Sequence, residues 1–151
     1  MTKSAEPLLE NDAHEKFMKT TGHLWGYMCI RFKNQGHGLL PFGCNDLRSA
    51  ALKAMGGKED GFVQCPYCRA SFTIGEVFFE YAIPLSRGGW FGVSNVEILC
   101  KLCSRRKGLL TTSEYYALLE FLETKIPLGR QDILNRIDRS TVFLGKKDQD
   151  E

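Results

Sequence analysis

The sequence lacks any apolar run long enough to cross a membrane, and it begins with polar and charged residues where a signal peptide would need an apolar stretch. It also lacks the cysteine density of a disulfide-stapled secreted scaffold, since its 151 residues include only six cysteines. Internal repeats and long linkers are absent as well. These absences predict a cytoplasmic protein in a reducing compartment, with no membrane partner. It should form one domain, or one domain with an appendage, large enough to bury a core.

Histidine is scarce, and all three histidines lie in the first quarter of the chain, at His14, His23 and His37. A strong net charge is absent too, since the formal value is only +2. The charge is unevenly placed, however, because residues 65–110 carry six Lys and Arg against three Glu. Three of the six are consecutive: Arg105, Arg106 and Lys107. Such a patch is typical of a phosphate-binding surface, although a solvated helix face would have the same composition.

Four of the six cysteines form two Cys-x-x-Cys pairs, Cys65 with Cys68 and Cys100 with Cys103, with 31 residues between the pairs. Two cysteines with two residues between them form a knuckle that presents both sulfurs to one side. Two knuckles supply the four soft ligands that tetrahedral Zn²⁺ prefers. The spacing therefore predicts a structural four-cysteine zinc site, with disulfides or free core thiols as the alternatives.

The first sixty residues are expected to form an α+β region. A short helix is predicted over residues 12–19, and the aromatic-rich segment 24–32 (LWGYMCIRF) is typical of a β-strand. A second helix should begin at the N-cap Asn45 and end at the glycine pair 56–57. Cys29 and Cys44 are interpreted as buried hydrophobic cysteines, with a second metal site that includes His23 or His37 as the alternative.

The segment between the cysteine pairs predicts a small β-structure followed by a helix. Residues 72–83 (FTIGEVFFEYAI) should form two strands or one hairpin, with the turn or bulge at Gly75-Glu76. Residues 85–95 are loop by their Gly and Ser content, and a short apolar run at 96–99 leads into the second knuckle. A short helix should then reach about Lys107 and end at Gly108.

The last forty residues predict a pair of helices. Thr111 and Glu114 form a capping box that opens an amphipathic helix ending before Pro127. A second helix should begin near Gly129 and Arg130 and pack with the first against the zinc region.

The segments CPYC, EYAIPLSRGG, SNVEILCKLC and SRRKG, within residues 62–110, together resemble the zinc-bearing HNH endonucleases that are common in phages and mobile elements. This resemblance covers a third of the chain. It implies a treble-clef-like ββα-metal core, in which the zinc site braces two strands and a helix. Glu80 matches the acidic residue that precedes the catalytic histidine of the family. Asn95 matches the asparagine that pins the loop, and Lys107 matches the lysine at the end of the motif.

Two positions depart from the family pattern, and both matter for chemistry. Tyr81 stands where the family has its general-base histidine, and Ser104 stands where Asn or His would lie near the metal. A phenol titrates near pKa 10, so Tyr81 should be protonated at neutral pH and unable to accept a proton readily. Losing a general base typically costs about 10²–10⁴-fold in rate. Glu80 could still supply an oxygen to Mg²⁺ or Mn²⁺, or it could be an exposed strand residue, and Tyr81 could be a packing residue.

Binding to nucleic acid, most simply DNA, could persist without cleavage. The resemblance places one face of the core against phosphates, where the candidate contacts are Arg87, Lys101, Arg105, Arg106 and Lys107. Trp90 and Phe91 lie between glycines in the loop. They could wedge into a groove, stack on bases, anchor a protein partner or fold back on the core.

The expected fold is therefore α+β: a zinc-stapled ββα-metal core at 61–110, a strand and helix region at 1–60, a helical hairpin at 111–144 and a disordered tail at 145–151. Three functions are compatible with it. The first is a nuclease-derived zinc protein that binds nucleic acid, or a nucleic-acid enzyme, without cutting. The second is an active Mg²⁺- or Mn²⁺-dependent endonuclease that uses Glu80, Asn95 and Ser104, with Tyr81 or a residue from the N-terminal region in place of the base. The third is a protein-interaction module, for instance a phage factor that acts on a host protein through Trp90, Phe91 and the C-terminal helices.

Overall fold

The computed structural model describes the backbone of residues 6–145 and the side chains of residues 12–138. Except for Gly145, the tail that the sequence predicts to be disordered lies outside the described residues. The chain combines five α-helices with two small sheets in this range, which agrees with the α+β class. None of the described helices is long and apolar enough to cross a bilayer.

The N-terminal region is helical, and the strand predicted at residues 24–32 is wrong. That segment belongs to a single helix, α1 (Glu6–Asn34), which also includes the short helix predicted at 12–19. The buried side chains of α1 are Phe17, Thr21, Met28 and Phe32, which recur at intervals of four and seven residues and so lie on one helical face. Packing of this face outweighs the β-propensity of the aromatic residues.

The second helix, α2 (Cys44–Ala54), forms close to where the sequence predicts it. Gly43 rather than Asn45 is its N-cap, and the Asp46 carboxylate accepts a hydrogen bond from the Gly43 amide at 2.7 Å. Arg48 joins the two helices, since its guanidinium donates to the Thr21 hydroxyl and to the Met18 carbonyl, both at 3.1 Å. The chain leaves α2 through Gly56 and Gly57, both at positive φ, as the glycine pair predicts.

Two antiparallel sheets of two strands follow. The first pairs β1 (Val63–Gln64) with β2 (Ser71–Phe72), and the second pairs β3 (Val77–Tyr81) with β4 (Val96–Cys100). The prediction of two strands in residues 72–83 is confirmed, but these strands do not pair with each other. A 3₁₀ turn over Ile74–Glu76 turns the chain from one sheet to the other. In the second sheet Glu80 lies opposite Glu97, and Tyr81 opposite Val96.

Three helices complete the fold: α3 (Lys101–Lys107), α4 (Thr112–Lys125) and α5 (Arg130–Gly145). The predicted capping box opens α4, because the Thr111 hydroxyl accepts from the Glu114 amide and the Glu114 carboxylate accepts from the Thr111 amide. Helix α5 lies beside α3, and the two are joined by the pairs Arg105–Asp138 at 2.8 Å and Arg106–Asn135 at 3.2 Å.

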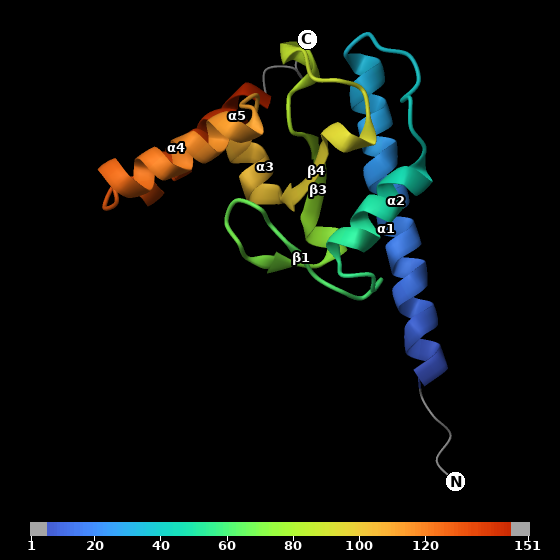
Figure 1. Ribbon diagram of the computed structural model, residues 1–151. Helices are drawn as coiled ribbons and strands as arrows, with labels where there is room; N and C mark the ends of the chain where they lie inside the picture. The colour runs from blue at the N-terminus through green and yellow to red at the C-terminus, as the bar shows by residue number, and fades with distance from the viewer. Residues whose placement is uncertain (1–5, 146–151) are drawn as a thin grey trace.

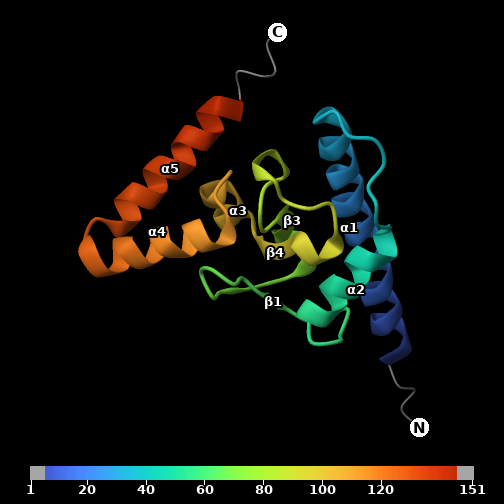
Figure 2. The same cartoon turned by 45° about the horizontal axis from the view of Figure 1, so that its top comes forward.

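The β3–β4 ladder stands between the N-terminal and C-terminal helices (Figures 1 and 2). Successive strand residues face opposite sides, so the ladder contributes to two cores. Val77 and Phe79 pack with the buried faces of α1 and α2. Leu99 packs on the other side with the cysteines and with Tyr115 of α4. The N-terminal helices therefore share a core with the segment between the cysteine pairs.

Candidate metal centre and the surface around it

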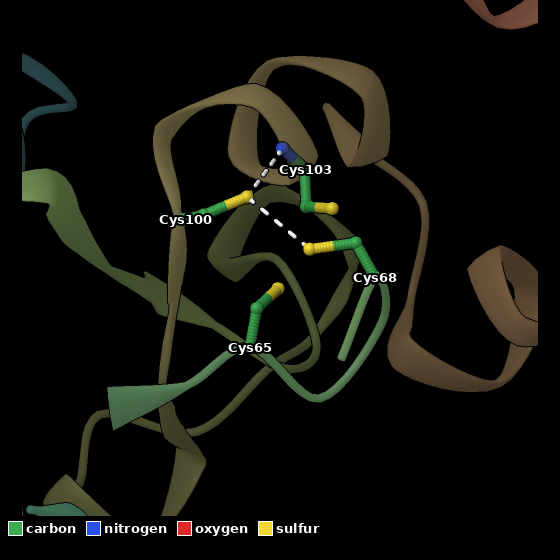
Figure 3. Close-up of side chains that lie close together, drawn as sticks. All are labelled: Cys65, Cys68, Cys100 and Cys103. Atoms are coloured by element: carbon green, nitrogen blue, oxygen red, sulfur yellow. Dashed lines mark hydrogen bonds between the residues drawn. The ribbon is translucent and has the colours of Figure 1, made fainter. Parts of the chain in front are cut away.

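The four paired cysteines converge at one point, as Figure 3 shows. Their sulfur atoms all lie within 4.8 Å of one another, and Sγ of Cys68 is 3.9 Å from Sγ of Cys100. A tetrahedral metal with metal–sulfur bonds of about 2.3 Å would place its sulfurs about 3.8 Å apart. Cys65, Cys100 and Cys103 are buried, whereas Cys68 is exposed. The cluster could hold a metal ion such as zinc.

Each knuckle has a local structure that aims its sulfurs inward. The first is the tip of the β1–β2 hairpin, where Arg69 adopts the left-handed conformation at φ 64° and its amide donates to the Cys65 carbonyl at 3.0 Å. The second is the start of α3. Cys100 is the N-cap of that helix, and its sulfur accepts a hydrogen bond from the Cys103 amide at 3.3 Å. A hairpin tip and a helix start thus supply two ligands each.

The electrostatics of the cluster favour the thiolate form at Cys65, whereas the pKa values of Cys100 and Cys103 are raised. A hydrogen bond from the Cys103 thiol, followed by backbone amides, lowers the pKa of Cys65 well below its ordinary value. The same bond, together with burial, raises the pKa of Cys103. A divalent cation would displace the thiol protons of the cluster, because metal binding requires deprotonated thiols.

A buried polar network braces the metal centre from behind. Tyr67, between the first two cysteines, donates to the Glu97 carboxylate at 2.6 Å, and Thr112 donates to the other oxygen of Glu97 at 3.0 Å. Burial, and next the bond to Glu97, raise the pKa of Tyr67. The Lys107 ammonium lies 3.5 Å from Glu97 and donates to the Tyr81 carbonyl at 3.0 Å.

Lys107 is therefore not placed as the sequence predicts for a phosphate contact. Its side chain is only 2% exposed. A buried ammonium group must be paired, and the Glu97 carboxylate and the backbone carbonyls supply its partners here. Its position instead ties α3 to the end of β3.

The Glu80 carboxylate accepts hydrogen bonds from two groups of the chain. Arg31 of α1 places Nη1 at 3.2 and 3.0 Å from its two oxygens, and the Ser104 hydroxyl donates to it at 2.8 Å. The sequence suggested a divalent metal beside Glu80 and Ser104. A guanidinium lies there, so a metal would have to displace a positive charge that is already hydrogen-bonded.

Tyr81 points to the opposite side of the strand from Glu80, toward the N-terminal helices. Its hydroxyl is buried and finds no hydrogen-bond partner among the described residues. Burial is the main cause that raises its pKa above the ordinary value for tyrosine. The phenol is thus protonated at neutral pH.

None of the described residues that line the shallow pocket at Glu80 and Tyr81 is a histidine. His14 lies 2.9 Å from the Glu59 carboxylate, and His37 contacts the rings of Phe32 and Phe91.

Asn95 is fully buried and holds the long loop closed. Its side-chain amide accepts from the Ile83 amide at 3.0 Å and donates to the carbonyls of Ile83 at 2.9 Å and Trp90 at 3.1 Å. Gly89 makes this approach possible, because a Cβ atom there would lie 1.9 Å from the Ile83 carbonyl oxygen. The loop-pinning role expected of Asn95 agrees with these contacts.

The other basic candidates differ in their freedom to contact phosphate. Arg87 forms a two-pronged ion pair with Glu114, and Arg105 pairs with Asp138. Lys101 is exposed and lies 5.5 Å from the centre of the Phe78 ring. Neither Lys101 nor Arg106 forms an ion pair with a described carboxylate. The basic patch is therefore smaller than the sequence count suggests.

The two aromatic residues of the loop are used differently. Phe91 packs its ring against Phe32 of α1 at 5.3 Å between centres, and against His37 at 4.8 Å. Trp90 is 51% exposed, and its indole Nε1 donates to the Ser94 hydroxyl at 2.9 Å. Phe91 thus folds back toward α1, while a large part of the Trp90 ring stays open to solvent.

The two remaining cysteines form no second metal site in the described part of the chain, where the only group of metal-ligating side chains found is the four-cysteine cluster. Cys29 and Cys44 are half-buried rather than fully buried. Burial, and then the neighbouring Cys44, raise the pKa of the Cys29 thiol. The raised pKa makes the Cys29 thiol less reactive than an ordinary cysteine.

Comparison with family models, with curated proteins and with solved structures gave no match to this chain.

Two residues that matter at these sites were missed by the sequence reasoning, Arg31 and Arg130. Arg31 was placed on a predicted strand, and only the helical spacing of the apolar residues 17, 21, 28 and 32 would have put it on α1. Arg130 was read only as a helix start, although it lines the pocket beside Cys68 and Cys103.

Proposed function

We propose that this chain is a zinc-stapled module of the ββα-metal type, related to the HNH endonucleases, that binds nucleic acid and has lost nuclease chemistry. Zinc is the favoured metal because four thiolates at near-tetrahedral spacing are the ligand set that it prefers. The two knuckles would hold it as a structural ion with no open coordination position.

The order of elements between and after the knuckles supports the family relationship. A strand, a long loop closed by an asparagine, a second strand and a short helix follow one another here in that order, as β3, the loop at Asn95, β4 and α3. The second knuckle sits where β4 passes into α3, so one metal would brace both elements.

The observation that carries the loss of chemistry is the contact of Arg31 with Glu80. Both carboxylate oxygens accept from this guanidinium, and Ser104 adds a third hydrogen bond. Glu80 is the candidate ligand of a catalytic Mg²⁺ or Mn²⁺, and an ion there would have to compete with a built-in cation. Tyr81, in the position of the general base, has a buried hydroxyl that cannot take up a proton at neutral pH.

Nucleic-acid binding is supported by the exposed Lys101, the half-buried Arg106 and Trp90. Lys101 and Arg106 have no carboxylate partner among the described residues. The pairs of Arg87 with Glu114 and Arg105 with Asp138 are partly exposed, and such pairs contribute little, so a phosphate could take the place of either carboxylate. The open Trp90 ring could stack on a base.

The test uses the full chain purified with its metal. A labelled DNA duplex should bind with an affinity that falls as salt rises, and Lys101→Gln should reduce the slope of log affinity against log salt by about 1. Plasmid incubated with the protein and Mg²⁺ or Mn²⁺ should remain supercoiled. Arg136→Gln on the outer surface of α5 is the matched charge control.

Two results would reject the proposal in different ways. Nicking of the plasmid that disappears in Glu80→Ala would restore the endonuclease. Absence of salt-dependent binding to DNA and RNA would instead favour a protein partner, with Trp90 as its anchor.

A further inference from the structure

A pocket beside the metal centre contains two arginines that form no ion pair with any carboxylate in the described part of the chain. It lies where the first knuckle, α3, α4 and α5 meet, and its walls include Arg106, Arg130, Gln131, Tyr115, Cys68 and Cys103. Its volume is about 210 Å³, below the roughly 300–1,000 Å³ of sites that enclose a whole drug-sized ligand. A pocket of this size suits one chemical group of a larger molecule.

The Nε atoms of both Arg106 and Arg130 are buried and find no hydrogen-bond partner among the described residues. Buried donors of charged groups are almost always satisfied, so two such atoms in one pocket require an explanation. Arg106 uses one terminal nitrogen on Asn135, at 3.2 Å. No described residue that lines the pocket is an aspartate or glutamate.

The sulfurs of Cys68 and Cys103 line the same pocket, but they do not serve as partners for the two arginines. Neither Nε atom donates to a sulfur. Hydrogen bonds to the cysteine cluster therefore do not explain the buried guanidinium groups.

We propose that this pocket binds a phosphate group, held between the guanidinium groups of Arg106 and Arg130. Guanidinium presents N–H donors in a planar fork that matches the oxygens of phosphate. Arg130 is the first residue of α5, and Gln131 follows it in the pocket wall, so the positive end of the helix dipole and a side-chain amide lie at the same wall. Carboxylates are absent from the described lining, which removes the repulsion that would weaken an anion there.

The phosphate could belong to a nucleic-acid backbone or to a small phosphorylated molecule, and the two sources are distinguished by the probes. Inorganic pyrophosphate is titrated calorimetrically into the full chain with its metal, at low salt. A 5′-phosphorylated DNA oligonucleotide is titrated in parallel. The variants are Arg130→Gln and Arg106→Gln. The control is Arg136→Gln, which removes the same charge from the same helix at a residue that is exposed and paired with Asp132.

Pyrophosphate should bind the parent protein and the control equally, and each pocket variant should lower its affinity at least tenfold, in keeping with the loss of a charge-assisted hydrogen bond. Arg130→Lys keeps the positive charge but lacks the planar fork of donors, so its affinity for pyrophosphate should lie between that of the parent and that of Arg130→Gln. A parallel loss of affinity for the oligonucleotide identifies the backbone as the source. Loss with pyrophosphate alone identifies a small phosphorylated ligand.

Equal pyrophosphate binding by the parent and both variants would overturn the proposal. So would a loss of bound metal in both variants, measured by metal analysis, with the pyrophosphate affinity of metal-loaded protein unchanged. These outcomes are separate from failure of the proposed function. If DNA and pyrophosphate each bind the parent and both variants equally, the nucleic-acid proposal is retained and the phosphate-pocket proposal is rejected. If pyrophosphate binds in the expected way and DNA does not bind, the phosphate-pocket proposal is retained and the nucleic-acid proposal is rejected.

Discussion

The guanidinium of Arg31 lies against the carboxylate of Glu80, 49 positions away in the sequence. The distance from its Nη1 to Oε2, the nearer carboxylate oxygen, is 3.0 Å. This contact joins the end of α1 to the end of β3, and it covers the carboxylate on which any divalent-metal chemistry at this strand would depend. The side chain of Glu80 is 21% exposed and that of Arg31 is 40% exposed, so the pair is half-way between a surface and a buried ion pair.

We expect the Arg31–Glu80 pair to contribute modestly to stability. Arg31→Met and Glu80→Gln should each lower the free energy of unfolding by about 1 kcal/mol, because water screens the exposed part of the pair. The two changes together should cost less than their sum, since each already removes the same interaction. Urea unfolding of the four proteins of this double-mutant cycle measures the coupling. Strict additivity would contradict a direct interaction.

The second prediction concerns the metal. Cys65→Ser should reduce the bound metal well below one ion per chain and unfold the β1–β2 hairpin and the start of α3, because an ion at the cluster would hold both elements. Cys44→Ser is the control, since Cys44 lies outside the cluster. Metal analysis and near-ultraviolet circular dichroism provide the measurements. A Cys65 variant that keeps its metal and its spectrum would show that the cluster is not a metal site.

Acidification should release the metal reversibly. Thiols must be deprotonated to bind metal, so protons compete with the ion as the pH falls. Because the pKa of Cys65 is lowered, its thiolate should remain deprotonated as the pH falls. The pKa of Cys103 is raised in the cluster, so this thiol should lose its proton only when a metal binds. A chromogenic chelator followed during a pH titration reports free metal. Constant retention of metal down to the acid unfolding of the helices would argue against four thiolate ligands.

The fourth prediction concerns Lys107. Lys107→Met should lower the free energy of unfolding by about 3 kcal/mol, because it leaves the largely buried Glu97 carboxylate without its cation and two carbonyls without their donor. Lys101→Met, in the exposed first turn of the same helix, should change it by about 0.5 kcal/mol or less. Thermal and urea unfolding provide the comparison. Equal effects would mean that the Lys107 ammonium reaches solvent.

Gly89→Ala should be more damaging than an ordinary glycine substitution in this region. A Cβ atom at Gly89 would lie 1.9 Å from the Ile83 carbonyl oxygen and 2.9 Å from the Asn95 amide nitrogen, so the loop would have to open. We expect a loss of about 2 kcal/mol or more in unfolding free energy. Gly75→Ala is the matched control, because its Cβ would meet no atom within 4 Å. Comparable stability of the two variants would contradict the closed loop.

Much of the central region could be predicted from local sequence. Two residues between paired cysteines, a glycine pair before Asn95 and a Thr-x-x-Glu box before α4 are short-range patterns, and each corresponds to a hydrogen bond between residues near in sequence. The convergence of the four sulfurs follows from the same kind of pattern, because each knuckle presents both of its sulfurs to one side.

The N-terminal region could not be read in this way. Aromatic and β-branched residues at 24–32 favour a strand locally, and Gly22 looks like a helix stop. Both signals were outweighed because residues 17, 21, 28 and 32 share one buried helical face, and from it Phe17 and Met28 join the core formed with α2 and β3. The functional consequence is direct, since the helix is what carries Arg31 to Glu80.

Local sequence was enough to predict the convergence of the four cysteines and the order strand, loop, strand, helix, because these depend on neighbours within a few residues. Which charged groups can reach a ligand was settled by the fold. It buried Lys107, covered Glu80 with Arg31, and left Arg106 and Arg130 facing one pocket. The physical reason is that a charge acts on groups brought close by folding, and neither burial nor the partner of a side chain is encoded in the residues beside it.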